Sequence, residues 1–324
     1  MDKLYLVILF PYSDNYSTFL FAFRKMTLKQ IEAFYWAGIC RNFAVAADRL
    51  CISVSSLSKR ISELEASLGT ELFDRSSRNA SLTAKGEDLL GFARTVLHHA
   101  EQFKERANKQ SAISGRCRFG MGEISSLTWM PKLISLIQRN HPLLVVEPDI
   151  GLGQVLEVKL EEGEIDFAVI AGRSTRAAIA SHVVGAVKFS WVCSPTLRQT
   201  IKPTADAAFD DAILITMPNT AGSIRILDKW LIANNIRTYR RMTCANLGAV
   251  AGLLRQGLGI GYLPQQWANR LVTRGDLEFL PEFPPLEPLQ YAFQWRRDDT
   301  RSLIDEMRAL VLASIDFELS TGLI

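Results

Sequence analysis

The sequence has little of what marks several specialised classes of protein. Its 324 residues include only 20 glycines and 12 prolines, which excludes a collagen-like or low-complexity chain. Apolar residues make up 48% of the chain, so it can form cores and is not expected to be disordered. Charge is nearly balanced, with 37 basic and 34 acidic side chains, so any nucleic-acid-binding surface has to be local.

Cysteine and histidine are too scattered to indicate a disulfide framework or a metal site. The cysteines are odd in number and include no C-x-x-C pair, which predicts reduced thiols. A redox-sensing pair is the alternative, and no cysteine spacing supports it. The five cysteines are Cys40, Cys51, Cys117, Cys193 and Cys244. The four histidines form no ligand cluster, so we expect neither a metal nor a cofactor.

No apolar run is long enough to cross a bilayer, which takes about 20 residues. The run at residues 4–10 is short, and the N-terminus lacks the basic start and small-residue cleavage site of a secretory signal. The sequence therefore predicts a cytoplasmic protein without a membrane partner. A helical pattern begins directly after Met26, which predicts that residues 1–25 are an upstream extension.

The first patterned block, residues 26–84, combines three helices with a short hairpin. Apolar residues at helical spacing predict helices over about 28–38 and 43–50, and a third that begins after Ser53 and ends near Leu68. Alternating stretches at 71–75 and 80–82 flank a polar turn. Helices joined by a tight turn and followed by such a hairpin predict a winged helix-turn-helix domain.

A long helix over about 83–110 follows, and it carries apolar residues at alternating steps of four and three. These residues are Leu89, Ala93, Val96, Ala100, Phe103 and Ala107. Such a seam is typical of a coiled coil, so we expect residues 85–112 to link the domains and pair two chains. The alternative is a single helix packed on its own domain.

Strand-like and helix-like segments alternate through the remainder, residues 113–317. This order predicts an α/β domain with mostly parallel sheets and helices on both faces. Two sets of such segments predict two lobes with a cleft between them. We expect the first lobe to comprise about 116–186 and 265–317, and the second about 187–264.

The third helix of the first block is the candidate recognition helix, because the N-terminal turn of such a helix faces base edges in the major groove. Its early polar and basic positions suit contacts with phosphates and bases, and two arginines at the hairpin turn suit contacts with the DNA backbone. The candidate DNA-binding residues are Ser53, Val54, Ser55, Ser58, Lys59, Arg60, Arg75 and Arg78.

A ligand of the two-lobed domain is expected at the carboxyl ends of the strands, where helix N-termini present backbone N–H groups. Candidates are Gly122, Glu123, Ile124, Ser125, Ser126, Thr128, Gly153, Thr216, Asn219, Thr220, Ser223 and Asn246. Glu123 has two interpretations, as a partner of a cationic or amine-bearing ligand or as a carboxylate that is solvated or lies at a helix N-terminus. No nucleophile stands beside a base pattern, so no catalytic residue is expected.

The motifs of both blocks resemble those of LysR-type transcriptional regulators. The resemblance is dense over residues 28–86 and looser at 163–168 and 257–264. In the first block it rests on Phe34, Asn42, Phe43, Ala46, Ala47, Leu50, Ile52, Ser53, Leu57, Ser58, Ile61, Leu64, Glu65, Leu68, Gly69, Leu72, Phe73, Arg75, Arg78, Leu82, Thr83 and Gly86. It implies a winged helix-turn-helix, a linker helix and a two-lobed domain similar to periplasmic binding proteins, in a homodimer or homotetramer that binds DNA and senses a small molecule.

One position departs from the family pattern. Family members commonly have glutamine after the capping serine of the recognition helix, whereas this chain has Val54. Valine forms no hydrogen bond with a base, but it can contact a thymine methyl group. The leading hypothesis is an effector-controlled regulator that binds a palindromic operator. The alternatives are a solute-binding protein of the same two-lobed fold and, with less support, an enzyme built on the α/β half.

Overall fold

The computed structural model describes residues 26–74, 81–107, 113–238 and 240–319. The expected upstream extension at 1–25 lies outside these residues. The chain divides into two units, Met1–Ala107 and Asn108–Ile324. Within the described ranges, no helix has the length and apolar character needed to span a membrane. The five cysteines are free thiols, and Cys51 and Cys244 are the two that are not buried.

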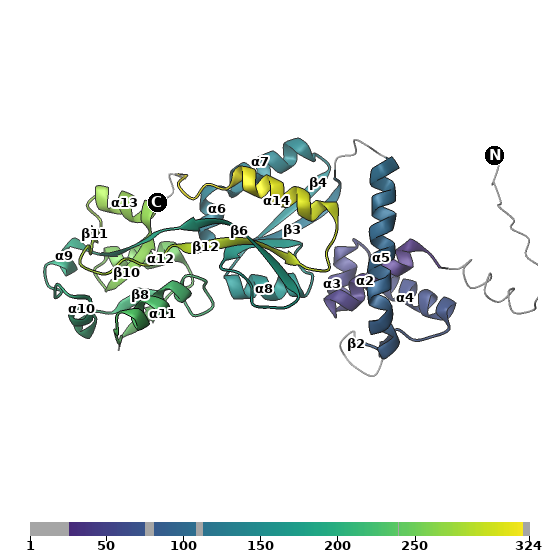
Figure 1. The fold of residues 1–324 in the computed structure, drawn as a ribbon, viewed down its shortest axis with the longest axis horizontal. Helices are drawn as coiled ribbons and strands as arrows, with labels where there is room; N and C mark the ends of the chain where they lie inside the picture. The colour runs from purple at the N-terminus through teal and green to yellow at the C-terminus, as the bar shows by residue number, and fades with distance from the viewer. Residues whose placement is uncertain (1–25, 75–80, 108–112, 239, 320–324) are drawn as a thin grey trace, which may run out of the picture. The chain divides into compact units, whose positions relative to one another are not determined.

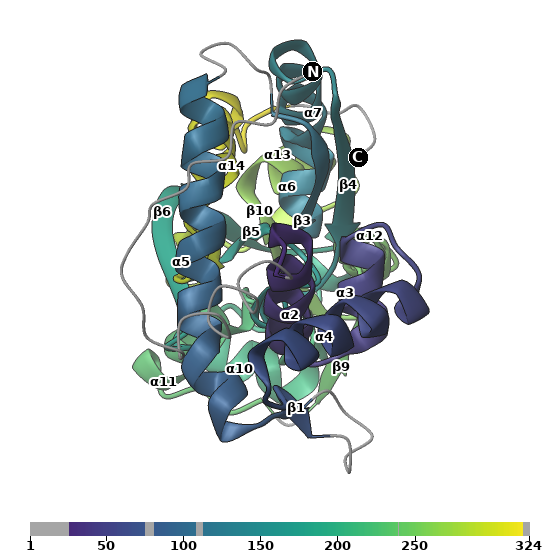
Figure 2. The same cartoon turned by 90° about the vertical axis from the view of Figure 1, so that its right-hand side faces the viewer.

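Three helices form the core of the first unit, and each begins after a capping side chain. They are α2 (Leu28–Cys40), α3 (Phe43–Arg49) and α4 (Val54–Leu68). Thr27, Asn42 and Ser53 each accept a hydrogen bond from a backbone N–H of the helix that follows. These caps satisfy N–H groups that have no partner within the helix. Helix α2 packs against α3, α4 and the long helix α5 (Figure 2).

A two-stranded wing follows α4. Strand β1 (Phe73–Asp74) pairs antiparallel with β2 (Ser81–Leu82), and α5 (Ala84–Ala107) begins directly after it. Gly86 is required at the start of α5, because a Cβ atom there would lie 2.2 Å from the carbonyl oxygen of Leu72. The wing turn, with Arg75 and Arg78, lies outside the described residues.

The seam expected along α5 divides between two environments. Ala93 is buried in the core of the first unit, and Leu89 packs against this core. Both positions fit the alternative, in which the helix packs on its own domain. In contrast, Phe92 is 64% exposed and Phe103 is 76% exposed, and Val96 is exposed as well. Ala93 and, in part, Leu89 thus cover the helix-turn-helix of their own chain, whereas the pairing of two chains along α5 stays a prediction.

The second unit consists of two lobes, each with a five-stranded sheet (Figure 1). The first sheet has the order β4-β3-β5-β12-β6, with β3, β4 and β5 parallel and β12 antiparallel to both its neighbours. Its strands are β3 (Gly115–Met121), β4 (Leu144–Ile150), β5 (Phe167–Ala171), β6 (Ile179–Val187) and β12 (Leu289–Arg296). The helices of this lobe are α6 (Glu123–Thr128), α7 (Met130–Asn140), α8 (Gly153–Glu161) and α14 (Ser302–Ser314). Buried side chains of α7 and α14 share one core with the sheet, and those of α8 form another.

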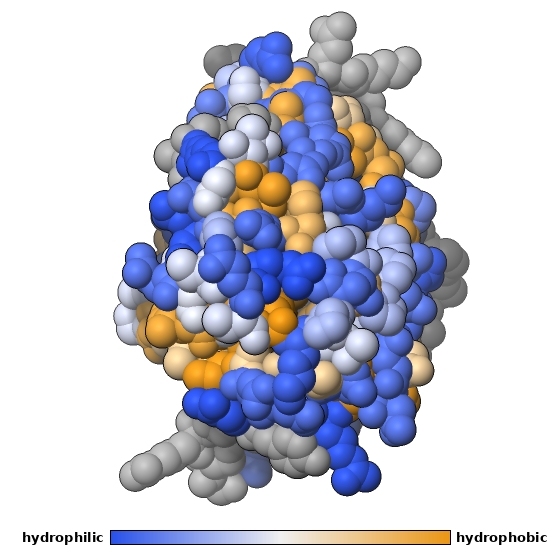
Figure 3. Space-filling model, turned by 90° about the vertical axis from the view of Figure 1, so that its left-hand side faces the viewer, coloured by the Kyte–Doolittle hydropathy of each residue, from blue (hydrophilic) through white to orange (hydrophobic). Residues whose placement is uncertain are grey.

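The second sheet has the order β11-β7-β10-β8-β9. Its strands are β7 (Phe189–Cys193), β8 (Leu214–Thr216), β9 (Arg241–Thr243), β10 (Ile260–Pro264) and β11 (Glu278–Phe279). Its helices are α9 (Pro195–Arg198), α10 (Ala205–Asp211), α11 (Ile224–Ala233), α12 (Leu247–Arg255) and α13 (Gln265–Thr273). Trp191 lies at the centre of this core, with ring contacts to Phe209, Trp230, Tyr262 and Phe283. On the face of this lobe in Figure 3, hydrophilic residues interrupt the hydrophobic patches.

The chain passes between the lobes twice. The first passage lies between β6 and β7, near residue 188, close to the expected boundary. The return comes with β12 at Leu289, later than the expected position near 265. The intervening segment stays with the second lobe because α13 packs on β10 and β7, and β11 pairs with β7.

A buried carboxylate joins α4 to the wing and gives the first test of this fold. One oxygen of Glu65 accepts hydrogen bonds from the backbone N–H groups of Leu72, at 2.8 Å, and Phe73, at 3.2 Å. Glu65→Leu leaves both donors without this acceptor, so we expect urea unfolding to show a loss of about 2–3 kcal/mol. Glu65→Gln keeps one acceptor oxygen and should lose less. The exposed Glu87→Leu is the control, and an equal loss in all three variants would contradict this role for Glu65.

Candidate functional site

Helix α4 presents its N-terminal turn to solvent. The Oγ of Ser53 accepts a hydrogen bond from the backbone N–H of Ser56 at 3.2 Å, and it lies 2.9 Å from the Oγ atoms of Ser55 and Ser56. Val54, the first residue of the helix, is 45% exposed. The first turn therefore presents only short side chains, so another surface can approach the helix end closely.

Basic side chains follow one turn later on α4. Lys59 is exposed and Arg60 is half-buried. Ser55, Ser58 and Lys59 are separated by three and four residues, which places them on one face of the helix, whereas Leu57 is buried. Among the described residues, no acidic side chain pairs with Lys59. Its ammonium group is thus available to a phosphate or a base edge.

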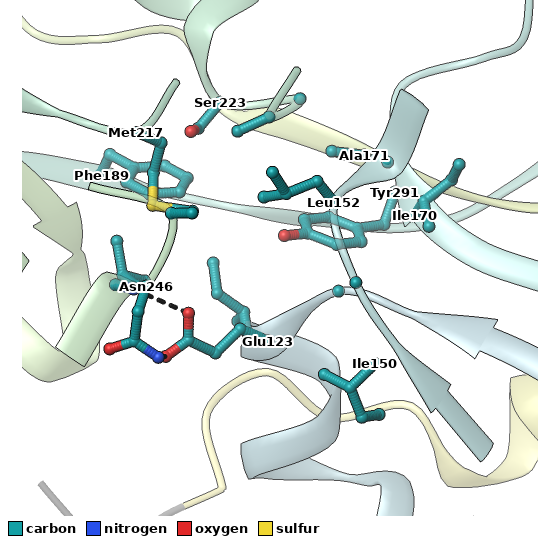
Figure 4. A pocket seen from close by; sticks show the side chains of 18 residues that line it. Glu123, Ile150, Leu152, Ile170, Ala171, Phe189, Met217, Ser223, Asn246 and Tyr291 are labelled. Atoms are coloured by element: carbon teal, nitrogen blue, oxygen red, sulfur yellow. Dashed lines mark hydrogen bonds between the residues drawn. The ribbon is translucent and has the colours of Figure 1, made fainter. Parts of the chain in front are cut away.

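A cavity of about 240 Å³ lies between the lobes of the second unit (Figure 4). Its walls come from the segments that follow β3 and β4 and from the end of β5 in the first lobe, and from the segments that follow β8 and β9 in the second. The lining residues are Gly122, Glu123, Ile124, Ile150, Gly151, Leu152, Gly153, Ile170, Ala171, Phe189, Met217, Ala221, Gly222, Ser223, Ala245, Asn246, Leu247 and Tyr291. Carboxyl ends of strands from both sheets therefore surround one space, as in other α/β proteins that bind ligands.

Glu123 reaches from the first lobe to the second. Its Oε2 accepts a hydrogen bond from the backbone N–H of Leu247 at 2.7 Å, and its Oε1 accepts from that of Gly248 at 3.3 Å. The side-chain amide of Asn246 donates to Oε1 at 3.0 Å. The carboxylate thus lies on the first turn of α12, where the helix dipole favours negative charge. The contact fits the interpretation of Glu123 as a carboxylate at a helix N-terminus, and the pairing with a cationic ligand stays an untested prediction.

The other expected ligand residues divide into two groups. Gly122, Ile124, Gly153, Ser223 and Asn246 line the cavity with Glu123. The remaining candidates, Ser125, Ser126, Thr128, Thr216, Asn219 and Thr220, are not among the lining residues.

Most of the side chains outside the lining have partners elsewhere. The hydroxyls of Ser126 and Thr128 bond to carbonyl groups of their own helix, and that of Thr216 lies 3.0 Å from the hydroxyl of Tyr262. The backbone carbonyls of Asn219 and Thr220 accept hydrogen bonds from Gln154 of the other lobe. Ser125 is fully buried on α6. Small polar residues near a strand end were therefore an incomplete guide to the cavity.

Sequence reasoning missed the apolar wall of the cavity. Ile150 and Ile170 lie at or next to the ends of their strands, and Met217 follows one. Phe189 and Tyr291 belong to the strands β7 and β12, which begin where the chain passes between the lobes. In the sequence these residues look like any core residue. Taking every residue at a strand's carboxyl end, whatever its polarity, would have found the first three.

Tyr291 contributes a polar atom to this apolar wall. Its hydroxyl points into the space between the lobes (Figure 4). Burial raises the pKa of the phenol, and the negative charge of Glu123 raises it further. Tyr291 therefore stays protonated and can donate a hydrogen bond to an occupant of the cavity.

The lobes also meet at the rim of the cavity. A Cβ atom on Gly222 would lie 2.4 Å from the Cβ of Ala171, so only glycine permits this approach. The backbone N–H of Gln154 donates to the carbonyl of Thr220 at 3.4 Å. These contacts, with those of Glu123, hold the two lobes together around the cavity.

Two family models match the chain. Residues 28–87 match the model described as bacterial regulatory helix-turn-helix protein, lysR family. Residues 110–315 match the model described as LysR substrate binding domain. The first match covers the helices and the wing, and the second covers both lobes.

Relatives and solved structures agree with these matches. The Hca operon transcriptional activator HcaR of Escherichia coli is 24% identical over 301 residues, which cover 90% of this chain and 99% of that protein. A full-length OxyR variant of Pseudomonas aeruginosa matches with a TM-score of 0.63 and 22% identity, over 90% of this chain and 96% of that one. Full-length LysG of Corynebacterium glutamicum with bound effector arginine matches with a TM-score of 0.59 and 19% identity, over 89% and 98%. These structures share the fold of this chain.

The Glu123 contact yields a test of how the lobes are held. Glu123→Gln keeps one acceptor oxygen but replaces the other with an NH2 group, which cannot accept from a backbone N–H, so Leu247 and Gly248 cannot both keep their acceptor. Hydrogen bonds to charged groups contribute about 1.5–3 kcal/mol, and partial exposure reduces that here. We therefore expect amide hydrogen exchange to accelerate roughly tenfold at whichever of Leu247 and Gly248 loses its acceptor, since a tenfold change corresponds to about 1.4 kcal/mol. The control is Glu162→Gln, at an exposed residue of the same lobe, and unchanged exchange in Glu123→Gln would show that the contact does not hold the lobes.

Proposed function

The chain belongs to the LysR family of bacterial transcriptional regulators, with a helix-turn-helix DNA-binding domain and an effector-binding domain, and we propose how its residues perform these roles. Helix α4 reads a palindromic operator, and the interlobe cavity holds the small-molecule effector. The protein acts in the cytoplasm as a homodimer or homotetramer, and it works by binding rather than by catalysis. The observation that carries the proposal is the N-terminal face of α4, exposed and rich in short polar side chains.

Geometry and charge support the proposed DNA-binding face. The first turn of a recognition helix contacts base edges, and the serine cluster beside Val54 leaves room for that approach. Val54 suits a thymine methyl group, whereas Ser53, Ser55 and Ser58 suit phosphate contacts. Lys59 and Arg60 supply positive charge beside them. Arg75 and Arg78 remain proposed clamps of the DNA backbone.

Effector control is supported by the cavity and by the fold. Strand ends and helix N-termini of both lobes line one space, so an occupant contacts both lobes at once. A ligand that binds one arrangement of the lobes better than another shifts the population toward it. LysG, which shares the fold, holds an arginine effector. We propose the same use of the interlobe space here, with a ligand of this chain's own.

The structure gives no support to either alternative function, a solute-binding protein or an enzyme. A solute-binding protein has no use for a helix-turn-helix with an uncovered recognition helix. For an enzyme, the polar side chains that line the cavity are Glu123, Ser223, Asn246 and Tyr291. The carboxylate of Glu123 already accepts three hydrogen bonds, so it is not placed to act as a general base.

Lys59→Ala tests the DNA face. If Lys59 contacts a base edge, the variant should lose about 1–3 kcal/mol of affinity for its preferred duplex. If it contacts a phosphate, the loss of affinity should be equal for all sequences. The slope of log affinity against log salt concentration should then become shallower by about one. Duplex titrations at several salt concentrations distinguish the two. Lys132→Ala, an exposed change in the second unit, is the control, and unchanged affinity for every duplex at low salt would refute the assignment of α4.

The exposed stripe of α5 tests assembly. Phe92, Val96 and Phe103 are separated by steps of four and seven residues, so they line one side of the helix, and a second copy could cover them. Burying an unpaired aspartate there costs several kcal/mol, on the order of 3–5. Phe103→Asp should therefore lower the oligomeric state in light scattering and weaken binding to a whole operator more than binding to a half-site. Arg94→Asp is the control, because residue 94 faces another side of the helix. A fully associated Phe103→Asp variant would show that another surface pairs the chains.

A further inference from the structure

We propose that the interlobe cavity takes an uncharged, largely apolar ligand, about the size of a benzene ring with one small polar substituent. The inference rests on the proposed function, since it names the class of effector for the same site. Three features carry it: the walls of the cavity, the charge of its lining and the inward hydroxyl of Tyr291.

The walls favour an apolar occupant. Ile150, Leu152, Ile170, Phe189 and Met217 surround the space from both lobes (Figure 4). An apolar cavity of about 150 Å³ holds benzene, whereas a drug-sized ligand needs about 300 Å³ or more. The volume of about 240 Å³ lies between these two values. One ring with a short substituent fills it, and a bicyclic ligand would force the lobes apart.

The charge of the lining disfavours an anion. Among the described residues that line the cavity, none is Lys, Arg or His, and Glu123 is the one acidic side chain. The positive end of α12 is already occupied by the carboxylate of Glu123. Arg225, close in sequence to the lining residue Ser223, is exposed and donates instead to the carbonyl of Arg173 at 3.4 Å. An anionic ligand would therefore face a fixed negative charge without a cationic side chain to compensate it.

The lining of the cavity also offers little stabilisation to a cationic ligand. Glu123 accepts three hydrogen bonds, from Asn246, Leu247 and Gly248, so its charge is already satisfied. An ammonium group would have to leave water and either share or break these bonds, and the loss of its hydration would not be repaid. A neutral ligand avoids both costs.

Tyr291 defines the polar part of the ligand. Its ring belongs to the wall, and its hydroxyl points into the cavity (Figure 4). A ligand hydroxyl, carbonyl or ether oxygen can accept a hydrogen bond from it. Buried hydroxyl groups left without a partner are costly, so the oxygen of the ligand fixes its orientation as well as its affinity.

The test uses three probes that share one ring and differ in charge. They are benzyl alcohol, which is neutral, benzylammonium, which is cationic, and benzoate, which is anionic at pH 7. Each is titrated into the full chain and followed by saturation-transfer NMR. Benzyl alcohol should bind at least tenfold more tightly than either ion. Binding of benzoate or benzylammonium that equals or exceeds that of benzyl alcohol, or no binding of any probe, would overturn the proposal.

A pair of matched variants locates the bound probe. Tyr291→Phe removes one hydroxyl and should weaken benzyl alcohol about fivefold, whereas Tyr35→Phe, the same change in the first unit, should have no effect. Thermal unfolding of both variants checks that they fold. Equal binding to Tyr291→Phe and the parent chain would place the probe elsewhere and refute the assignment.

A duplex titration on the same preparation separates this inference from the proposed function. DNA binding without the expected probe selectivity would contradict the ligand class alone. Selective probe binding without DNA binding would contradict the proposed regulator and leave the cavity assignment standing.

Discussion

A carboxylate of one lobe on the first helical turn of the other sets the character of the candidate effector site. Glu123 follows β3 directly, and three donors at the start of α12 hold its oxygens. The contact joins residues more than 120 positions apart, and the cavity lies next to it. Because the carboxylate neutralises the positive end of α12, that helix is not free to attract an anionic ligand. The contact of Glu123 with α12 thus determines both the shape of the site and its preference for an uncharged ligand.

The strands and the C-terminal segment connect this cavity to the rest of the second unit. Tyr291 lies on β12, which pairs with β5 and β6 in the first sheet, and its ring contacts Phe317 at 4.8 Å between centroids. Phe317 also packs against Trp129, and it borders the buried cores of both lobes. A ligand that moved Tyr291 would therefore disturb packing in both lobes. This packing supports the proposal that an occupant of the cavity acts on the arrangement of the lobes.

Local signals in the sequence were enough to predict the helices of the first unit, because helix caps and apolar spacing depend on residues that are close in sequence. Ser53 caps α4 as predicted, and the buried face contains Leu57. Long-range packing was beyond those signals. Leu89 and Phe103 occupy equivalent places in one apolar pattern, yet only the neighbouring helices decide that the first is covered and the second exposed. Tyr291 could not be told from a core tyrosine, because the space in front of its hydroxyl is formed by residues distant in sequence.

The two units use a helix N-terminus in opposite ways, and this difference matches their proposed partners. The start of α4 is capped by the neutral hydroxyl of Ser53, and its first turn contains no acidic residue. Its partial positive charge is therefore not neutralised by an acidic residue of that turn, which suits the proposed contact with DNA phosphates, and Lys59 lies one turn away. At the start of α12 the carboxylate of Glu123 accepts a hydrogen bond from the backbone, so the positive end of this helix is neutralised within the protein. A negative partner is thus favoured at the first helix, whereas an uncharged one suits the cavity beside the second.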